Sequence, residues 1–324
     1  MRHLVAYHGN RYLDHFRRDL DEMADHGFNG VVHCVTEADI AWSRRRVGEM
    51  FTTTREAGFE CGADPWGVGG VFGGEAHSGF MARHPDAVQV TDDGSPLPAA
   101  CLRHPRFRDH MRSWVDAVAE AGAESVFWDE PHLGVPFDSR LSCYCSGCEQ
   151  ERDGTDITAF RVATTLDFLD EMTRYAASMG VRSSACLYPV GPDAATAMGL
   201  PSIEDVAALP GVDDIAVDPY PLFVLLEGRT YADFDAERFV GSWADRLRKV
   251  AADAGVTCHL WIQGFGLPKG YEHLVVECAA AARAHGIDDL AFWSYRASEA
   301  GVAMPSDDPA AAWAAAKLAF RENQ

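Results

Sequence analysis

Two adjacent carboxylates, Asp129 and Glu130, follow the apolar run Val-Phe-Trp and are themselves followed by Pro131. Successive strand residues point to opposite sides, so we expect one carboxyl to face a site and the other to brace it. A carboxyl held between Trp128 and a second carboxylate has a raised pKa, which suits a general acid at neutral pH. The pair therefore predicts acid–base chemistry, although a helix cap beside a surface acid would give the same sequence.

Three cysteines spaced Cys-x-Cys-x-x-Cys could supply three thiolates from one tight turn: Cys143, Cys145 and Cys148. Tetrahedral zinc takes a fourth ligand, for which we predict Cys101, with His104 and His132 as alternatives. A closed four-cysteine site within residues 98–150 would be structural and would join two long loops. Unmetallated thiols or a redox switch would use the same residues.

Eight short apolar runs, separated by segments of helical period, must position these groups. They are Leu4–Tyr7, Gly30–Cys34, Cys61–Ala63, Ser125–Trp128, Ser184–Tyr188, Asp214–Val217, His259–Ile262 and Leu290–Trp293. Strands buried on both faces have this composition, as in a parallel sheet. Eight such units predict an α/β fold, a single (β/α)8 TIM barrel over residues 1–324, with long loops after the third and fourth strands. An open doubly wound sheet is the rival, but no Gly-x-Gly-x-x-Gly follows the first run.

Aromatic, carboxylate and amide side chains recur at the carboxyl ends of these runs, where TIM barrels carry their active sites. Such a pocket suits a sugar, whose ring faces stack on aromatic groups while its hydroxyls need polar partners. The predicted substrate-binding residues are Asp64, Trp66, His132, Tyr220, Trp261, Gln263, Trp293 and Tyr295. The glycine-rich stretch 66–75 is expected to form a flexible lid with Phe72 as a closing wedge.

Residues 98–150 resemble glycoside hydrolase family 42, the zinc-containing β-galactosidases of clan A. The likeness rests on a lone cysteine before His-Pro-x-Phe-Arg, a strand ending in Glu130, and the Cys-Tyr-Cys-x-x-Cys segment. It implies that Glu130 is the acid/base and that zinc is bound by Cys101, Cys143, Cys145 and Cys148. The chain departs from the clan at Asp129, where Asn is usual, and at Gln263, where the nucleophilic Glu is usual. The β-galactosidase activity is therefore not carried over.

The partner of Glu130 is not fixed by these residues. Asp218, at the sixth strand end, is the best placed base or nucleophile, with Asp64 and Glu299 as alternatives. A third scheme is substrate-assisted, because Asp129–Glu130 is also similar to the Asp-Glu pair of hexosaminidase-like barrels. There the substrate's own acetamido group is the nucleophile.

Two other classes of function use the same strand ends. Metal-dependent barrel hydrolases or isomerases draw ligands from such positions, here His8, His33, Asp64 and His132. A non-catalytic sugar-binding barrel would need the pocket but not the acid. We expect a glycoside hydrolase acting on a small oligosaccharide or glycoside, with a structural Zn²⁺ and no organic cofactor.

Charge and composition exclude several partners. Lys+Arg 28 against Asp+Glu 49 gives a net charge of −21, which disfavours nucleic acids and anionic membranes. No apolar stretch approaches the ~20 residues of a membrane span, and charge and glycine interrupt the N-terminus before a signal-peptide core could form. An odd number of cysteines, nine, fits a reducing compartment. We therefore predict a cytoplasmic protein and leave homo-oligomerisation open.

Overall fold

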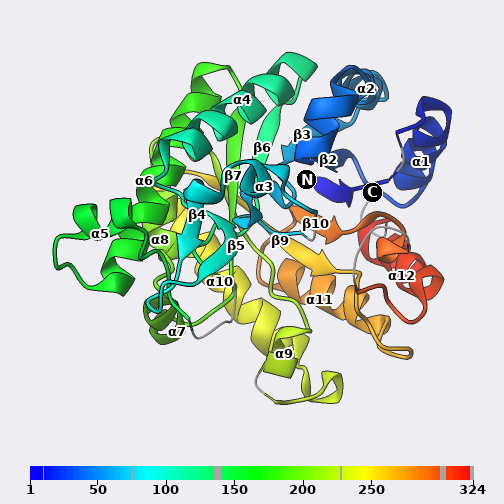
Figure 1. Cartoon of the computed structure of the whole chain (residues 1–324). Helices are drawn as coiled ribbons and strands as arrows, with labels where there is room; N and C mark the ends of the chain where they lie inside the picture. Colours follow the sequence, from blue (N-terminus) through cyan, green and yellow to red (C-terminus); the bar gives the residue numbers. More distant parts are fainter. Residues whose placement is uncertain (10, 75, 135–139, 227, 300–303, 322–324) are drawn as a thin grey trace.

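Eight parallel strands form a closed barrel in the order β1-β10-β9-β8-β7-β6-β3-β2 (Figure 1). The computed structural model describes residues 1–9, 11–74, 76–134, 140–226, 228–299 and 304–321. The barrel strands are β1 His3–Tyr7, β2 Gly30–Cys34, β3 Glu60–Asp64, β6 Ser125–Trp128, β7 Arg182–Leu187, β8 Asp214–Val217, β9 Thr257–Gln263 and β10 Leu290–Trp293. Each predicted run is a barrel strand, so the TIM-barrel prediction is confirmed.

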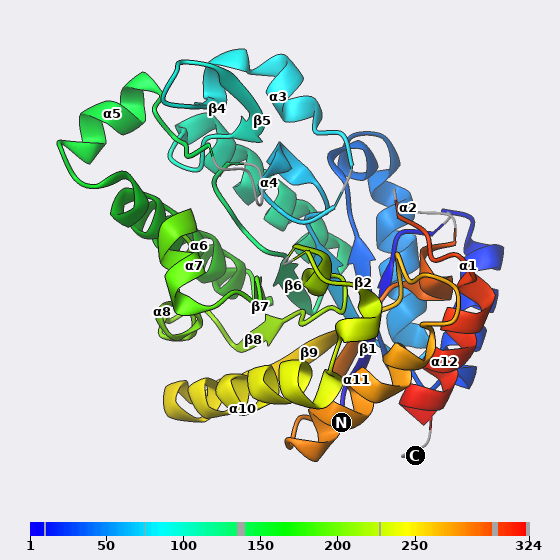
Figure 2. The same cartoon turned by 90° about the horizontal axis from the view of Figure 1, so that it is seen from below.

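Helices surround the barrel, as the view from below shows (Figure 2). The longer ones are α1 Leu13–Asp25, α2 Glu37–Glu56, α4 Pro105–Ala121, α6 Ile157–Ser178, α10 Ala236–Ala254, α11 His273–Ala284 and α12 Pro309–Arg321. Sequence signals mark their ends: Thr36 and Asp39 form a capping box on α2, and Gly255 with φ 74° closes α10. None of the described helices is long and apolar enough to cross a membrane.

Side chains of the strands pack on both faces of the sheet. One cluster fills the barrel interior and includes Val32, Phe127 and Trp261, whereas a larger one lies between the strands and the helices. Because neither face meets water, the strands are apolar throughout rather than alternating. This double burial explains why the strands could be recognised from short apolar runs.

Two long segments rise from the carboxyl ends of the neighbouring strands β3 and β6. The first contains the short helix α3 Gly79–Arg83 and an antiparallel hairpin, β4 Val88–Val90 with β5 Pro96–Ala100. The second contains α5 Ser146–Arg152 and includes residues 135–139, which lie outside the described part. The hairpin was not predicted, because β5 begins with Pro-Leu-Pro and prolines are unusual in strands.

Other short helices sit in the later loops: α7 Pro192–Met198, α8 Ile203–Ala207 and α9 Phe223–Leu226. Single 3-10 turns complete the structure at η1 Val68–Gly70, η2 Pro85–Ala87, η3 Tyr231–Asp233 and η4 Tyr295–Ser298. Of these elements, η1 and α9 adjoin the barrel mouth, where Gly70 and Phe223 line a cavity.

A buried polar network closes the amino-terminal end of the barrel. Asp214, at the start of β8, accepts hydrogen bonds from Arg2 at 2.6 Å, Ser184 at 2.6 Å and His259 Nδ1 at 2.7 Å. Arg2 also donates to Asp289, next to β10. These contacts lower the pKa of Asp214, because its charge is matched by neighbouring cations and donors that outweigh burial. The network ties the first strand to the later ones.

Candidate active site

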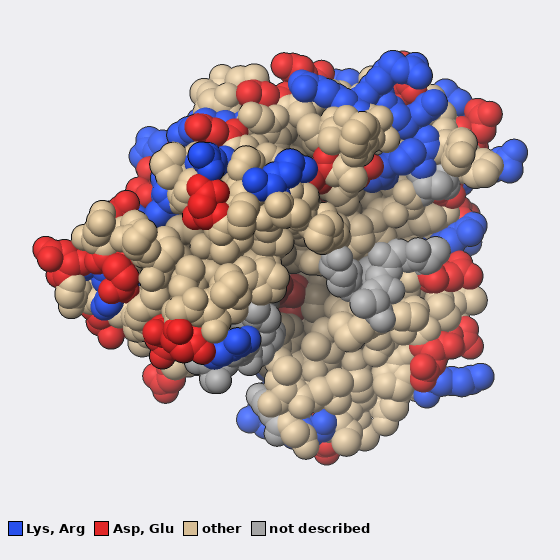
Figure 3. Space-filling model, viewed as in Figure 1, with Lys and Arg blue, Asp and Glu red and all other residues tan. Residues whose placement is uncertain are grey.

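A cavity of about 620 Å³ opens at the carboxyl ends of the barrel strands. Acidic atoms are visible at the bottom of the central hollow of this face (Figure 3). Aromatic rings dominate the walls: Trp66, Tyr188, Tyr220, Phe223, Phe265 and Trp293. No lysine or arginine lines the cavity in the described part of the chain. Its chemistry is therefore acidic and aromatic.

Four carboxyl groups meet at the base of this cavity because each follows or ends a parallel strand. Asp64 is the last residue of β3, and Asp218 is the first residue after β8. Asp129 and Glu130 are the first two residues after β6. Asp129, Glu130 and Asp218 line the cavity, whereas Asp64 is fully buried beside them.

Burial and mutual repulsion keep protons on this cluster. Burial raises the pKa of Glu130 well above its usual range, and the charges of Asp218 and Asp129 raise it further. Burial raises the pKa of Asp129 to about 7. The pKa values of Asp64 and Asp218 are raised by burial and then by Asp129. Several carboxylates this close cannot all ionise where access to solvent is restricted, so the cluster retains protons at neutral pH.

Glu130 is the best connected of the four. Its carboxyl lies within hydrogen-bonding reach of Asp218 and of the Tyr188 hydroxyl. Its backbone has φ 45°, its N–H donates to the Cys186 carbonyl at 3.2 Å, and its carbonyl pairs with His132 Nδ1 at 2.7 Å. A left-handed glutamate is unfavourable by itself, so these contacts must hold it in place.

The expected division between Asp129 and Glu130 is not observed. Both side chains line the same cavity, rather than one facing it and the other bracing it from behind. The strand ends at Trp128, and the left-handed turn at Glu130 breaks the alternation on which the expectation depended.

Four of the predicted wall residues line the cavity: Trp66, His132, Tyr220 and Trp293. The His8 ring stacks on Trp66 with 4.9 Å between centroids, and Tyr220 meets Phe265 edge-on at 5.3 Å. Burial lowers the pKa of His132 to about 4, so this histidine is neutral. These rings form a stiff aromatic wall above the carboxyl groups.

The glycine-rich loop is packed down onto the site. A Cβ at Gly73 would lie 2.0 Å from Asp129 Oδ2, and one at Gly74 would lie 1.7 Å from the Trp66 ring. Phe72 is 2% exposed and packs against Trp128 and Phe168, so it belongs to the core and is not a closing wedge. Residues 66–74 therefore pack as a wall of the cavity, and their glycines permit close approach; Glu75 lies outside the described residues.

Trp261 and Gln263 lie below or beside the cavity rather than in its lining. Trp261 is 1% exposed and packs between Phe127 and Trp293 inside the barrel. The Gln263 amide donates to the Phe265 carbonyl and the Tyr231 hydroxyl, and its oxygen accepts from the Leu222 N–H. These two side chains support the wall from behind. The prediction that Trp261 and Gln263 contact the sugar directly is therefore corrected.

Tyr295 points away from the barrel mouth. Its hydroxyl donates to Asp19 at 2.8 Å and Glu22 at 2.9 Å, both on α1, and its ring meets Trp313 of α12. The chain turns sharply after β10, where Arg296 and Ala297 adopt left-handed backbone angles. The prediction that Tyr295 forms part of the sugar-binding wall is therefore corrected: it joins two helices.

Several lining residues were not assigned to the site from the sequence. Tyr188 follows β7 directly, and its position at a strand end was the available signal. Phe223 and Phe265 come from loops, for which strand periodicity gives no information. Glu130 and Tyr188 also line a second cavity of about 300 Å³, which extends toward α6, α7 and α8. Glu130 thus lies between the two cavities.

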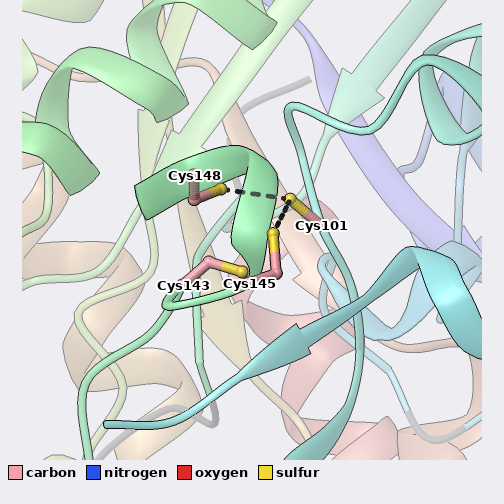
Figure 4. Close-up of side chains that lie close together, drawn as sticks. All are labelled: Cys101, Cys143, Cys145 and Cys148. Atoms are coloured by element: carbon pink, nitrogen blue, oxygen red, sulfur yellow. Dashed lines mark hydrogen bonds between the residues drawn. The ribbon is translucent and has the colours of Figure 1, made fainter. Parts of the chain in front are cut away.

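The four cysteines converge on one point (Figure 4). Their sulfur atoms all lie within 4.8 Å of one another, and Cys101 Sγ is 3.5 Å from Cys148 Sγ and 3.9 Å from Cys145 Sγ. Zn–S bonds of about 2.3 Å in a tetrahedron place sulfur atoms about 3.8 Å apart, so the residues present fit zinc. Cys101 follows β5, Cys143 and Cys145 precede α5, and Cys148 lies within α5.

The histidines of the metal-dependent alternative do not converge. His33 Nε2 pairs with Thr54 on α2, and His8 Nε2 pairs with Ser294. Within the described ranges, the four cysteines are the one group of His, Cys, Asp or Glu with metal-binding proximity. This geometry gives the metal-dependent reading no ligand set at the barrel mouth.

The fold is similar to that of several solved glycoside hydrolases. GH5_18 from Bifidobacterium longum subsp. infantis has a TM-score of 0.64 and 12% identity, covering 99% of this chain and 79% of that one. GH5_18 from Streptomyces cattleya in complex with GlcNAc has a TM-score of 0.63 and 15% identity, covering 100% and 81%. An exo-β-1,4-mannosidase from Opitutaceae bacterium strain TAV5 has a TM-score of 0.59 and 13% identity, covering 99% and 59%.

These likenesses show a shared fold at low identity, and the chain spans less than two thirds of that mannosidase. No protein-family model matches the chain, and no curated protein matches its sequence. The resemblance to family 42 therefore stays a prediction.

Proposed function

We propose that this protein is a glycoside hydrolase with Glu130 as its general acid. The observation that carries the proposal is the carboxyl cluster in an aromatic cavity: Glu130 is in contact with Asp218, and Trp66, Tyr220 and Trp293 surround them. Aromatic faces bind sugar rings, and a proton-bearing carboxyl supplies the acid that glycosidic cleavage requires. The glycoside hydrolase folds of the structural neighbours support this reading.

Glu130 protonates the leaving oxygen in this scheme. In the free protein its carboxyl is hydrogen-bonded to that of Asp218. A glycosidic oxygen entering between them takes over the hydrogen bond from Glu130. Asp218 is then free to face the anomeric carbon as base or nucleophile. The charge of Asp129 raises the pKa of both Glu130 and Asp218, which favours retention of the proton.

Turnover of a panel of α- and β-aryl glycosides by wild type and Glu130→Gln tests this function. We expect at least one glycoside to be cleaved and kcat/KM to fall by ~10² or more in the variant. Glu56→Gln, an exposed glutamate on α2, is the matched control and should retain full activity. Binding of sugars with no turnover by either protein would support the sugar-binding barrel instead.

We also propose that Cys101, Cys143, Cys145 and Cys148 bind a structural zinc ion. The converging sulfur atoms support it, and the site would pin the segment after β3 to the segment after β6. Metal analysis should find one zinc per chain, and Cys145→Ser should lower both zinc content and the melting temperature. Cys258→Ser, a half-buried thiol on β9, is the control. Full stability without zinc would refute the site.

A further inference from the structure

We propose that the sugar bound in the cavity carries a protonated amino group at C2, so that the substrate is a glycoside of a 2-amino sugar. This inference rests on the glycoside hydrolase function proposed above and adds the chemical class of the substrate.

A group of acids without a balancing cation is the first argument. Asp129, Glu130 and Asp218 line the cavity, while its described lining includes no lysine or arginine. The empty cluster retains protons, and a cation entering this space would favour the ionised carboxylates and be attracted by them. The net charge of −21 on the whole chain favours the approach of a cationic ligand in the same way.

An unused hydrogen-bond acceptor is the second and independent argument. Asp218 is 6% exposed, lines the cavity, and its Oδ1 has no hydrogen-bond partner among the described residues. Buried carboxylate oxygens are normally satisfied, so this acceptor points to a missing donor.

The donor that fits best is an ammonium group. It offers three N–H donors and no acceptor, whereas a hydroxyl or an acetamide also presents lone pairs to the carboxylates. The rings of Trp66, Tyr220 and Trp293 stand around the same space, and aromatic faces attract cations. The cavity therefore matches a cation that is attached to a sugar ring.

The position of the amino group follows from the acid. Asp218, which has the free oxygen, is in contact with Glu130, and Glu130 acts at the anomeric oxygen. A cation paired with Asp218 must then sit on a carbon next to the anomeric centre. In a pyranose ring of an aldose, that substituted carbon is C2.

Three aryl glycosides that differ only at C2, with an amine, an acetamide or a hydroxyl, test the inference. We expect kcat/KM to be at least ~10-fold higher for the amine than for the hydroxyl, as one charge-assisted hydrogen bond allows. Asp218→Asn should bring the ratio of glucosamine to glucose affinity toward one, whereas Asp92→Asn, at an exposed site on the β4–β5 hairpin, should preserve that ratio and the ratio of rates. Equal rates on all three, or a preference for the acetamide, would overturn the amino-sugar inference while leaving hydrolysis intact.

Calorimetry with glucosamine and with glucose separates the two proposals when nothing is cleaved. Selective binding of glucosamine without turnover of any glycoside would refute the hydrolase and keep the amino-sugar site. Equal or absent binding of the two sugars, together with no turnover, would refute both.

Discussion

Alanine at position 73 would place a methyl group where the Asp129 carboxylate lies. The new Cβ would be 2.0 Å from Asp129 Oδ2, whereas Cβ contacts under 3.0 Å are essentially never seen. The carboxylate or the loop must therefore shift by at least about 1 Å, and a misplacement of that size in an active site costs on the order of 100-fold in rate. We expect Gly73→Ala to lower kcat/KM by ~100-fold, equivalent to about 2.7 kcal/mol of transition-state stabilisation.

The assay is kcat/KM on the glycoside that the wild type cleaves best, with thermal unfolding measured in parallel. Gly48→Ala, inside α2 with nothing within 4 Å of its Cβ, is the matched control and should keep its activity with equal or higher stability. Because the clash needs the Asp129 side chain, any loss of melting temperature caused by Gly73→Ala should vanish in an Asp129→Ala background. Wild-type activity in Gly73→Ala would refute the placement of Asp129 in the catalytic cluster.

The remaining predictions concern pH and position. Because Glu130 must be protonated and its pKa is raised, kcat/KM should fall as pH rises through that pKa. A glycoside with a dinitrophenyl leaving group, which needs no acid, should not show this fall. If the fall persists with that substrate, another group causes it. The pKa of Asp129 is raised to about 7 in the folded protein, so the folded state loses stability as pH rises from about 4, the pKa of an unfolded Asp, to about 7. Asp129→Asn should therefore raise the melting temperature at pH 8. A melting temperature below that of the wild type would contradict this reasoning. Asp214 has a lowered pKa, so its stabilisation is present above pH ~4 and is lost below it; Asp214→Asn should cost about 3–5 kcal/mol at pH 7, measured by urea unfolding, and little at low pH. Tyr295→Phe should lower the melting temperature and leave KM within ~2-fold, since its hydroxyl serves α1; a large rise in KM would return Tyr295 to the sugar wall.

The sequence was sufficient for the barrel because its strands are buried on both faces. Runs such as Gly30–Cys34 and Leu290–Trp293 coincide with strands, since no alternation with polar residues obscures them. The hairpin β4–β5 was not predicted from the sequence, because prolines are unusual in strands. Position along a strand was thus predictable, whereas structure within long loops was not.

At the site, the strand ends predicted which residues come together but not how closely. Asp129, Glu130 and Asp218 meet as expected, yet the contact between Glu130 and Asp218 depends on the left-handed turn at Glu130, which no spacing encodes. The prediction for Tyr295 was wrong for the same kind of reason, because three left-handed residues redirect the chain directly after it. Local backbone conformation, rather than periodicity, decides these side-chain directions.

The pairing of β1 with β10 sets the order in which the molecule can be completed. β1 pairs with β2 on one side, whereas on the other side His3 is in register with Leu290, far away in the sequence. Contacts of such long sequence separation form late and slowly. Trp293, which ends β10, lines the cavity that holds the carboxyl groups after β6 and β8, so this cavity has its full wall only when β10 has joined the barrel.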